Sequence, residues 1–365
     1  MSELTAEQEE IRSLARRFAD EKIAPHAAEW DRNHTFPTDV FSSLADLGFM
    51  GVCIPEEHGG AGADFLSYML VLEELSRGDA GVGVTVAVHT SACTLPLLDH
   101  GSPYVPALAA GEEIGAFALT EAGSGSDASA MTTRFAGGRI TGAKQWITNG
   151  SHASTILVFA READGRIGAF VVREGFTVAR EEEKLGLNSS STADLVFEDT
   201  PAERLGEPGN GMAIALRTLD GGRIGIAAQA VGIAQAAFEL ATSYAKERHA
   251  FGGPIAQLGA IQQKLADMQT EIEAARALVW RAARLKEARL PHGVEGAQAK
   301  LFASRVARHW TGEAIQVLGG YGYTREFPAE RFYRDAKVTE IYEGTSEIQR
   351  LGIARALLGE AARGA

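Results

Sequence analysis

Residues 341–351 place a carboxylate directly before a glycine, in a stretch of otherwise apolar and hydroxyl-bearing side chains. Because Gly344 has no side chain, a flat ligand could lie against the backbone at this point. A carboxylate packed beside such a ligand loses water, which raises its pKa and makes Glu343 a better proton acceptor. The same residues also suit a loop before a helix, with Thr345 as its cap and Glu347 in its first turn. Taken alone, the segment favours the loop.

A glycine-rich stretch, residues 120–127, follows an apolar strand predicted at 115–119. Its backbone amides and hydroxyls could form a concave cradle for an anion such as a pyrophosphate. It is not the dinucleotide-binding fingerprint, because Ala128 occupies the third glycine position and no βαβ unit follows. A plain turn is the simpler interpretation of these residues by themselves.

Residues 144–150 end in the turn dipeptide Asn-Gly. Trp146 could stack on a planar ring and Thr148 could form a hydrogen bond to one. A core tryptophan at a hairpin is the competing interpretation, and the residues alone favour it.

Two predicted helices end in groups that could bind a phosphate or a ligand. Arg248 could cap helix carbonyls or form a fork onto a phosphate. The helix that ends at residues 316–322 contains Gly319 and Gly320, which allow either a C-cap or the close approach of a ligand.

The histidines and cysteines carry no recognisable chemistry. His89, His249 and His309 lack metal-ligand spacing and are interpreted as structural or surface residues. Cys53 and Cys93 are too few for a disulfide framework, so we expect small buried thiols in a reducing compartment.

The elements that must position these residues fall into three groups. Helical periodicity is predicted near residues 11–19, 40–47 and 65–76, and Thr5 with Gln8 has capping-box spacing. Short strands follow at 132–141, 155–160, 167–172 and 193–197, which favours an antiparallel sandwich or barrel. Long helical patterns then return, with apolar positions at 226–241, 261–285 and 302–318 and a short final helix over 348–358.

We therefore predict a mostly α, α+β fold in three domains. These are an N-terminal helical domain (1–113), a central antiparallel β-barrel or sandwich domain (114–208) and a C-terminal four-helix bundle (209–365). At 365 residues the chain exceeds the usual size of a single core.

Composition narrows the function classes. The net charge of -13 argues against binding to nucleic acid and to anionic membrane surfaces. Residues 1–7 are acidic and predict no signal peptide, and no apolar run approaches the ~18 residues of a membrane span. We expect a cytoplasmic protein.

Together, and in this order, the motifs resemble the acyl-CoA dehydrogenase family over essentially the whole chain. The matching stretches are residues 118–127, 144–150, 248–252, 328–337 and the run from 316 to 351.

The resemblance implies an FAD enzyme without a Rossmann fold that oxidises the Cα–Cβ bond of an acyl-CoA thioester to a trans-2-enoyl-CoA. Glu343 matches the catalytic base of the short- and medium-chain members. In the family, the backbone amide of that residue and a ribityl hydroxyl of FAD stabilise the enolate oxygen, and the β-hydrogen leaves as hydride. A subset carries its base before an arginine in the long helix, but here Gly222 stands before Arg223.

The resemblance also assigns binding residues. It places Ser126 near the CoA arm and, on the substrate side, Asp220, Gly221, Gly222, Arg223 and Gly344. The implied contacts with FAD are Phe117, Leu119, Thr120, Gly125, Ser126, Trp146, Ile147, Thr148, Thr345, Ser346 and Glu347. Arg248, Phe251, Gln316, Val317, Leu318, Gly319 and Gly320 resemble residues that reach the FAD of a neighbouring subunit, which implies a homo-oligomer, usually a tetramer.

Three departures from the family pattern lie outside the base. Ala122 replaces a common proline, Gly259 replaces a glutamine that contacts FAD, and Gln263 replaces an aromatic residue. The expected electron acceptor is an electron-transfer flavoprotein. An acyl-CoA oxidase or a decarboxylating relative, a flavin-bearing binding or repair protein and a non-catalytic scaffold remain as alternatives. A repair protein would need a basic surface, and a scaffold would not need Glu343.

Overall fold

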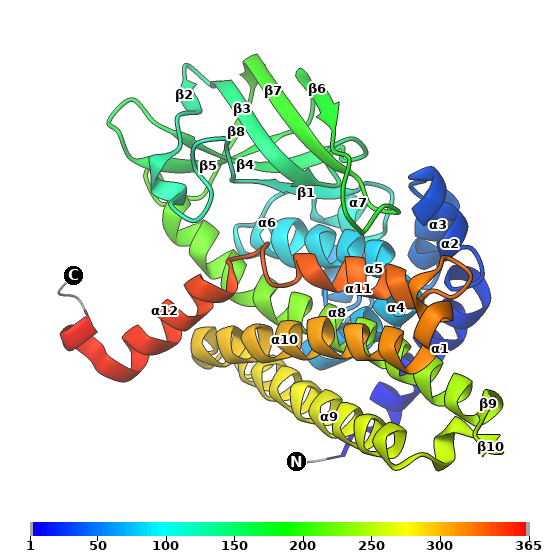
Figure 1. Ribbon diagram of the computed structural model, residues 1–365. Helices are drawn as coiled ribbons and strands as arrows, with labels where there is room; N and C mark the ends of the chain where they lie inside the picture. Colours follow the sequence, from blue (N-terminus) through cyan, green and yellow to red (C-terminus); the bar gives the residue numbers. More distant parts are fainter. Residues whose placement is uncertain (1–2, 363–365) are drawn as a thin grey trace.

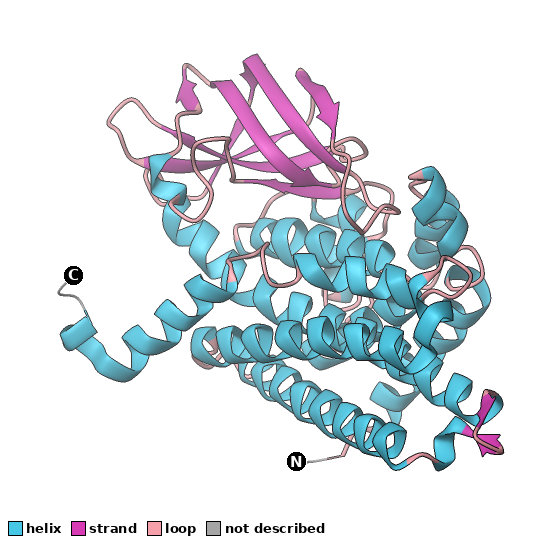
Figure 2. Ribbon diagram, in the orientation of Figure 1, coloured by secondary structure: helices cyan, strands magenta, loops and turns pink. Residues whose placement is uncertain are grey.

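The computed structural model describes residues 3–362 and divides into a helical N-terminal part, a β domain and a helical C-terminal part. Residues 1–2 and 363–365, which belong to the first and last predicted domains, lie outside the described residues. The β domain occupies one end of the molecule, and the helices form the rest (Figures 1 and 2). The predicted fold class is confirmed.

The first part consists of short helices that pack around one buried helix, α4. The predicted capping box is present, since Gln8 N donates to Thr5 Oγ1 at 3.2 Å and Thr5 N donates to Gln8 Oε1 at 3.0 Å. Every residue of α4 is buried. The helices are α1 (Ala6–Phe18), α2 (Ala27–Asn33), α3 (Thr38–Asp46), α4 (Phe65–Gly78), α5 (Ala80–Ala87), α6 (Leu95–Asp99) and α7 (Val105–Ala109), with π-helical turns η1 (Ala19–Ile23) and η3 (Val88–Thr94).

The β domain is built on one sheet in the order β6-β7-β3-β2-β4-β5-β8, with β1 paired to β4. Most neighbours are antiparallel as predicted, but β1 and β2 both run parallel to β4. Parallel neighbours need a crossover, so these pairs cannot be hairpins of consecutive strands. The strands are β1 (Gly115–Ala118), β2 (Arg134–Ala136), β3 (Arg139–Thr148), β4 (Thr155–Arg161), β5 (Ile167–Val172), β6 (Phe176–Glu181), β7 (Thr192–Pro201) and β8 (Glu203–Leu205).

Three long helices dominate the C-terminal part, and α4 packs across two of them, α8 and α9. A small hairpin, β9–β10, lies at the end of the molecule opposite the β domain (Figure 2). The last helix, α12, projects from the body (Figure 1). The elements are α8 (Gly211–Glu247), β9 (His249–Ala250), β10 (Gly253–Pro254), α9 (Gly259–Glu287), α10 (Gly293–Leu318), α11 (Ala329–Val338) and α12 (Ser346–Leu358).

Two helical segments are longer and more apolar than the sequence interpretation allowed. Ala80–Asp99 and Gly211–Glu247 both reach a mean hydropathy of 1.4 over a span-length window. Within those windows, 89% and 78% of the residues are buried inside the fold. The expectation that no apolar run approaches the length of a membrane span was therefore wrong, because both segments are long and apolar enough. Their burial shows that they are helices of the core.

His89 joins the helical part to the first strand. The buried ring accepts a hydrogen bond from Gly115 N through Nδ1 at 3.0 Å, and its Nε2 lies 3.1 Å from the carbonyl of Leu108. Burial lowers the pKa of His89 to about 4, which favours the neutral ring that these two contacts require. The residue is structural, as the sequence interpretation expected.

A buried charge cluster ties α1, α4 and α8 together. The carboxylate of Glu74, 1% exposed, lies 2.8 Å from Arg77, 3.1 Å from Arg12 and 3.4 Å from Arg16. Arg77 and Arg16 also contact Glu239 on α8. Removing one partner from a buried group of charges leaves the others uncompensated.

We predict that Glu74→Gln lowers the free energy of unfolding by about 3–5 kcal/mol, because it removes the buried carboxylate that Arg12, Arg16 and Arg77 share. The matched control is Glu239→Gln in the same cluster, where a side chain that is 33% exposed can be replaced by water. For the control we expect a loss of about 1 kcal/mol or less. Urea denaturation of both variants measures the difference. Equal losses would contradict this account of the cluster.

Candidate functional site

The loop between α11 and α12 turns sharply at the predicted base. Glu343 has a φ of 51° and Gly344 a φ of 91°, so both adopt the left-handed conformation. That conformation is unfavourable for a glutamate and persists only where surrounding contacts impose it. Thr345 then caps α12 by accepting a hydrogen bond from Ile348 N at 3.3 Å, as predicted.

Two buried side chains hold the carbonyl groups of this turn. Lys300 Nζ on α10 donates to Gly344 O at 2.6 Å. Gln349 Nε2 on α12 donates to the same oxygen at 2.8 Å and to Glu343 O at 3.3 Å. These contacts from α10 and α12 hold the two peptide groups that follow Glu343.

The Glu343 carboxylate points at α8, where Gly222 makes room for it. A Cβ at position 222 would lie 1.9 Å from Glu343 Oε2, a distance that no real contact allows. A side chain at this position would displace the carboxylate. With Glu343 in this position, residue 222 therefore has no room for a side chain and cannot carry a second candidate base.

Three buried polar atoms at this point have no partner within the described residues. They are Glu343 Oε2, Arg223 Nε and Gln349 Oε1. Buried polar groups are normally paired, so a cluster of orphans indicates a place for a ligand's polar groups. Arg223 is otherwise engaged by Asp220, 2.6 Å from its Nη1.

Burial sets the protonation chemistry of Glu343. Loss of water raises the pKa of the carboxyl to about 7, and the charges of Lys300 and Arg223 oppose that rise. A carboxylate with a pKa near the working pH can accept a proton from a weak carbon acid and still be ionised beforehand. The hydroxyl of the adjacent Tyr342 donates to Gln229 Oε1 on α8, which anchors the loop from its other side.

A buried ion pair anchors the glycine-rich loop to the strand that carries Trp146. Lys144 Nζ lies 2.9 Å from Glu121 Oε1 and 2.9 Å from Leu119 O. Burial would raise the pKa of Glu121, but hydrogen bonds from Lys144, Thr132 and Thr133 lower it to about 2. Gln145 N also donates to Thr120 O at 2.9 Å. The two motifs are thus held as one unit.

Trp146 faces outward from this unit. The pairing of β3 with β7 shifts between Lys144 and Ile147, and Trp146 has a φ of 59° in that irregularity. Such a bulge re-aims a side chain, and the Trp146 residue is 55% exposed. The alternative of a core tryptophan is wrong. The nearby loop is open as well, since a Cβ at Gly123 or Gly125 would meet no atom within 4 Å.

A third group of predicted residues lines a groove at the far end of the long helices. Its volume is about 560 Å³, and the guanidinium of Arg248 lies 5.7 Å from the centre of the Tyr321 ring. The groove is lined by Tyr244, Arg248, Ile255, Val317, Leu318, Gly319, Gly320, Tyr321, Thr324 and Glu326. Phe251, in the adjoining hairpin, is 94% exposed with a φ of 52°.

The groove and the Glu343 site are far apart in one chain. Gly222 lies in α8, and Arg248 directly follows the last residue of that helix. The helix between them spans about 39 Å at roughly 1.5 Å per residue. In Figure 1 the β9–β10 hairpin and α12 likewise lie at different ends of the molecule. Residues at the two places cannot bind the same dinucleotide within a single chain.

The remaining predicted residues divide by exposure. Ile147, Leu119 and Leu318 are buried, so the side chain of Ile147 packs in the core and only its backbone can face a ligand. Ser346 is buried and donates its amide to Glu340 O at 2.9 Å. On the predicted substrate side, Asp220 and Gly344 are half-buried and Gly221 is buried. The exposed or half-exposed residues among the predicted FAD contacts are Phe117, Thr120, Gly125, Ser126, Thr148, Gln316, Gly319, Gly320, Thr345 and Glu347.

Sequence reasoning missed Lys300 and Gln349. A signal for Lys300 was available, because it shares one helical face with Ala297, Ala303 and Ala307, and all are buried. A lysine in a stripe of small buried residues has to meet an acceptor inside the protein. Gln349 gave no comparable signal, since a glutamine in the first turns of an exposed helix is ordinary.

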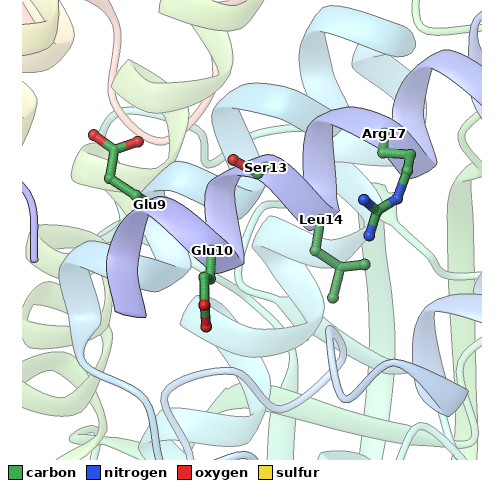
Figure 3. A pocket seen from close by; sticks show the side chains of 5 residues that line it. All are labelled: Glu9, Glu10, Ser13, Leu14 and Arg17. Atoms are coloured by element: carbon green, nitrogen blue, oxygen red, sulfur yellow. The ribbon is translucent and has the colours of Figure 1, made fainter. Parts of the chain in front are cut away.

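Another surface hollow of about 440 Å³ lies beside α1 (Figure 3). Its lining consists of Glu9, Glu10, Ser13, Leu14 and Arg17, all from that one helix. None of the predicted site residues contributes to it.

Comparison with known proteins agrees with the geometry. Models of the N-terminal, middle and C-terminal domains of acyl-CoA dehydrogenases match residues 5–112, 116–200 and 209–358. The chain belongs to the acyl-CoA dehydrogenase family. It is 48% identical to the short-chain specific acyl-CoA dehydrogenase of rat mitochondria over 98% of this chain and 91% of that protein.

Solved structures similar to this chain come from several bacteria. A chain of the electron transferring flavoprotein structure from Acidaminococcus fermentans has a TM-score of 0.96 at 44% identity, with 98% of this chain and 100% of that one covered. Butyryl-CoA dehydrogenase from Megasphaera elsdenii gives 0.95 at 41% identity, with the same coverage. Acyl-CoA dehydrogenase of Bacillus anthracis, complexed with FAD, gives 0.93 at 34% identity, covering 99% and 68%.

We predict that Gly222→Ala slows acyl-CoA dehydrogenation by about 100-fold or more, because the new methyl group displaces the carboxylate by over an ångström. The measurement is the turnover rate with an acyl-CoA thioester and an artificial acceptor. Gly352→Ala is the control, since a Cβ there meets nothing within 4 Å and the residue also lies in a helix. An unchanged rate in Gly222→Ala would show that the carboxylate need not occupy this position.

Proposed function

We propose that this chain dehydrogenates a short acyl-CoA thioester between Cα and Cβ, and that Glu343 removes the α-proton. The observation that carries the proposal is the Glu343 carboxylate itself, whose buried Oε2 has no partner among the described residues. Its pKa of about 7 suits proton abstraction near neutral pH. The proton moves from Cα to the carboxylate, and the electron pair of the broken bond becomes part of the new double bond as the β-hydrogen departs with its own pair.

The backbone amide of Glu343 supports the same role. Within residues 3–362 the Glu343 amide donates no hydrogen bond to a backbone carbonyl. The amides of Tyr342 before it and of Ser346 after it both do. An unpaired amide in a rigid turn can donate to the thioester oxygen as negative charge develops there. The carbonyl contacts from Lys300 and Gln349 hold the two peptide groups that follow this amide. Base and oxyanion donor would then belong to one residue.

The residues present fit FAD as cofactor. Trp146 offers an exposed indole, the loop at Gly123 and Gly125 is sterically open, and both are held together by the Lys144–Glu121 pair. We infer that Thr120, Ser126, Trp146 and Thr148 bind the flavin end, with Thr345 and Glu347 adjoining it. When bound, FAD supplies the acceptor for the hydride.

A short acyl chain is the substrate class that we propose. The curated relative is named short-chain specific, and a structural relative is a butyryl-CoA dehydrogenase. We expect residues 82–98, which include the entirely buried turn η3, to line the bottom of the acyl pocket. There Tyr68 Oη lies 3.1 Å from Ser91 Oγ and 3.2 Å from Ala87 O. Faster bleaching by a long-chain than by a four-carbon acyl-CoA would contradict this assignment.

We further propose a homo-oligomer in which the groove at Arg248 binds the FAD held at the Glu343 site of another copy. The separation of these two places along α8 supports it, as do the exposed glycines and Phe251 beside the groove. The projecting α12 also exposes Leu351, Leu357 and Leu358, by 51%, 77% and 60%. Sedimentation of the flavin-loaded protein as a monomer would contradict the proposal.

For the electron acceptor we propose an electron-transfer flavoprotein, in a cytoplasmic setting. The structure from Acidaminococcus fermentans with which this chain aligns is described by that protein's name. In an oxidase, oxygen would instead reoxidise the reduced flavin at a rate comparable to turnover. Stopped-flow reoxidation with oxygen and with an electron-transfer flavoprotein separates the two.

We predict that the purified protein is yellow and that anaerobic butyryl-CoA bleaches its flavin band. Glu343→Gln should keep flavin and acyl-CoA binding but reduce the flavin about 10²–10⁴-fold more slowly, because the amide cannot accept the α-proton. Anaerobic stopped-flow absorbance measures both. The surface variant Glu7→Gln on α1 serves as the control. A colourless protein that takes up no FAD, or bleaching by Glu343→Gln at the wild-type rate, would contradict the proposed function.

A further inference from the structure

Lys300 is a lysine with no exposed surface in the middle of α10. Fully buried lysines are rare, because loss of water disfavours the charged ammonium unless a partner replaces it. Burial lowers the pKa of Lys300 to about 8, against the opposing charge of Glu343. Within residues 3–362 the one hydrogen bond of its ammonium goes to Gly344 O, the carbonyl of the residue after the proposed base.

The charges around Glu343 come from a small number of elements. Lys300 lies on α10, and Arg223 on α8 is paired with Asp220. The negative charges of Glu340 in the preceding loop and Glu347 on α12 also raise the pKa of Lys300. Tyr342 beside Glu343 is neutral, because burial raises its pKa well above the usual value. No salt bridge of residues 3–362 includes Lys300, so its charge is not already balanced by a paired carboxylate as that of Arg223 is.

The same ammonium therefore acts on the turn in two ways. Through its 2.6 Å contact with Gly344 O it holds the left-handed backbone that aims the Glu343 side chain at Gly222. Through its charge it favours the ionised carboxylate against the cost of burial. A neutral donor such as Gln349, which contacts the same carbonyl at 2.8 Å, can share only the first task.

We propose that Lys300 is a positioning residue for the reaction, one that fixes the Glu343–Gly344 turn and supplies the positive charge that keeps the base ready to accept a proton. The inference rests on the proposed role of Glu343. It predicts two separable losses, of geometry and of charge. Lys300→Met removes both, whereas Lys300→Gln keeps an uncharged donor and removes only the charge.

The test is the anaerobic rate of flavin reduction by saturating butyryl-CoA as a function of pH. For Lys300→Gln we expect the rising limb of the profile to move up by about one pH unit, so that reduction is about fivefold slower near pH 7, about tenfold slower below about pH 6, and recovers at high pH. Lys300→Met should show the same shift together with a rate loss at every pH. Lys300→Arg should return the limb toward its wild-type position.

Lys184→Met is the control, because Lys184 also donates to a backbone carbonyl, that of Ser190 at 2.8 Å, in a loop of the β domain. It should leave the profile in place. A uniform loss of rate in Lys300→Gln without a pH shift would overturn the proposal, as would an unchanged profile. If Lys300→Met does not fold, the glutamine variant alone decides the result.

A second readout separates this inference from the proposed function. The carbonyl stretch of the protonated Glu343 carboxyl can be followed by infrared difference spectroscopy and assigned by its absence in Glu343→Gln. Its titration should move to higher pH in Lys300→Gln whether or not Glu343 is the base. No movement overturns the inference. Movement without any effect of Glu343→Gln on flavin reduction would instead refute the role of Glu343.

Discussion

The burial of one carboxylate constrains much of the structure around it. Glu343 can be placed against α8 only because Gly222 lacks a side chain, and it stays partly ionisable only because Lys300 and Arg223 are near. Its left-handed backbone needs the carbonyl contacts from α10 and α12. Each of these elements belongs to a different part of the C-terminal fold, so their packing and the chemistry of the carboxylate depend on each other.

The same logic applies at the glycine-rich loop. A buried lysine–glutamate pair joins the glycine-rich loop to β3, and an irregularity in β3 turns Trp146 out of the sheet. Both sites thus use a buried ammonium to fix a turn that carries a functional group. The long helices α8 and α10 contribute to the Glu343 site with their first halves and to the groove at Arg248 with their ends. Rigid helices of this length let one chain contribute to two separated sites.

Much of this could be predicted from the sequence. Periodicity predicted the long helices and most strands, and the capping residues Thr5 and Thr345 were found at their positions. The ordered motifs indicated the family. Local pattern could not predict that Trp146 faces outward, because its direction depends on a register shift against β7. Nor could it predict the role of Lys300, whose acceptor lies on another element. The parallel pairing of β1 with β4 was missed for the same reason, since it depends on a contact distant in sequence.

We propose that burial tunes Glu343 to act as the base near neutral pH. The most direct measurement is the pH dependence of single-turnover flavin reduction in the wild-type protein at saturating butyryl-CoA. The account predicts a rate that rises with pH, levels off above a pKa of about 7, and falls about tenfold for each unit below it. A rate already at its plateau near pH 5, as for an ordinary exposed glutamate, would contradict the account.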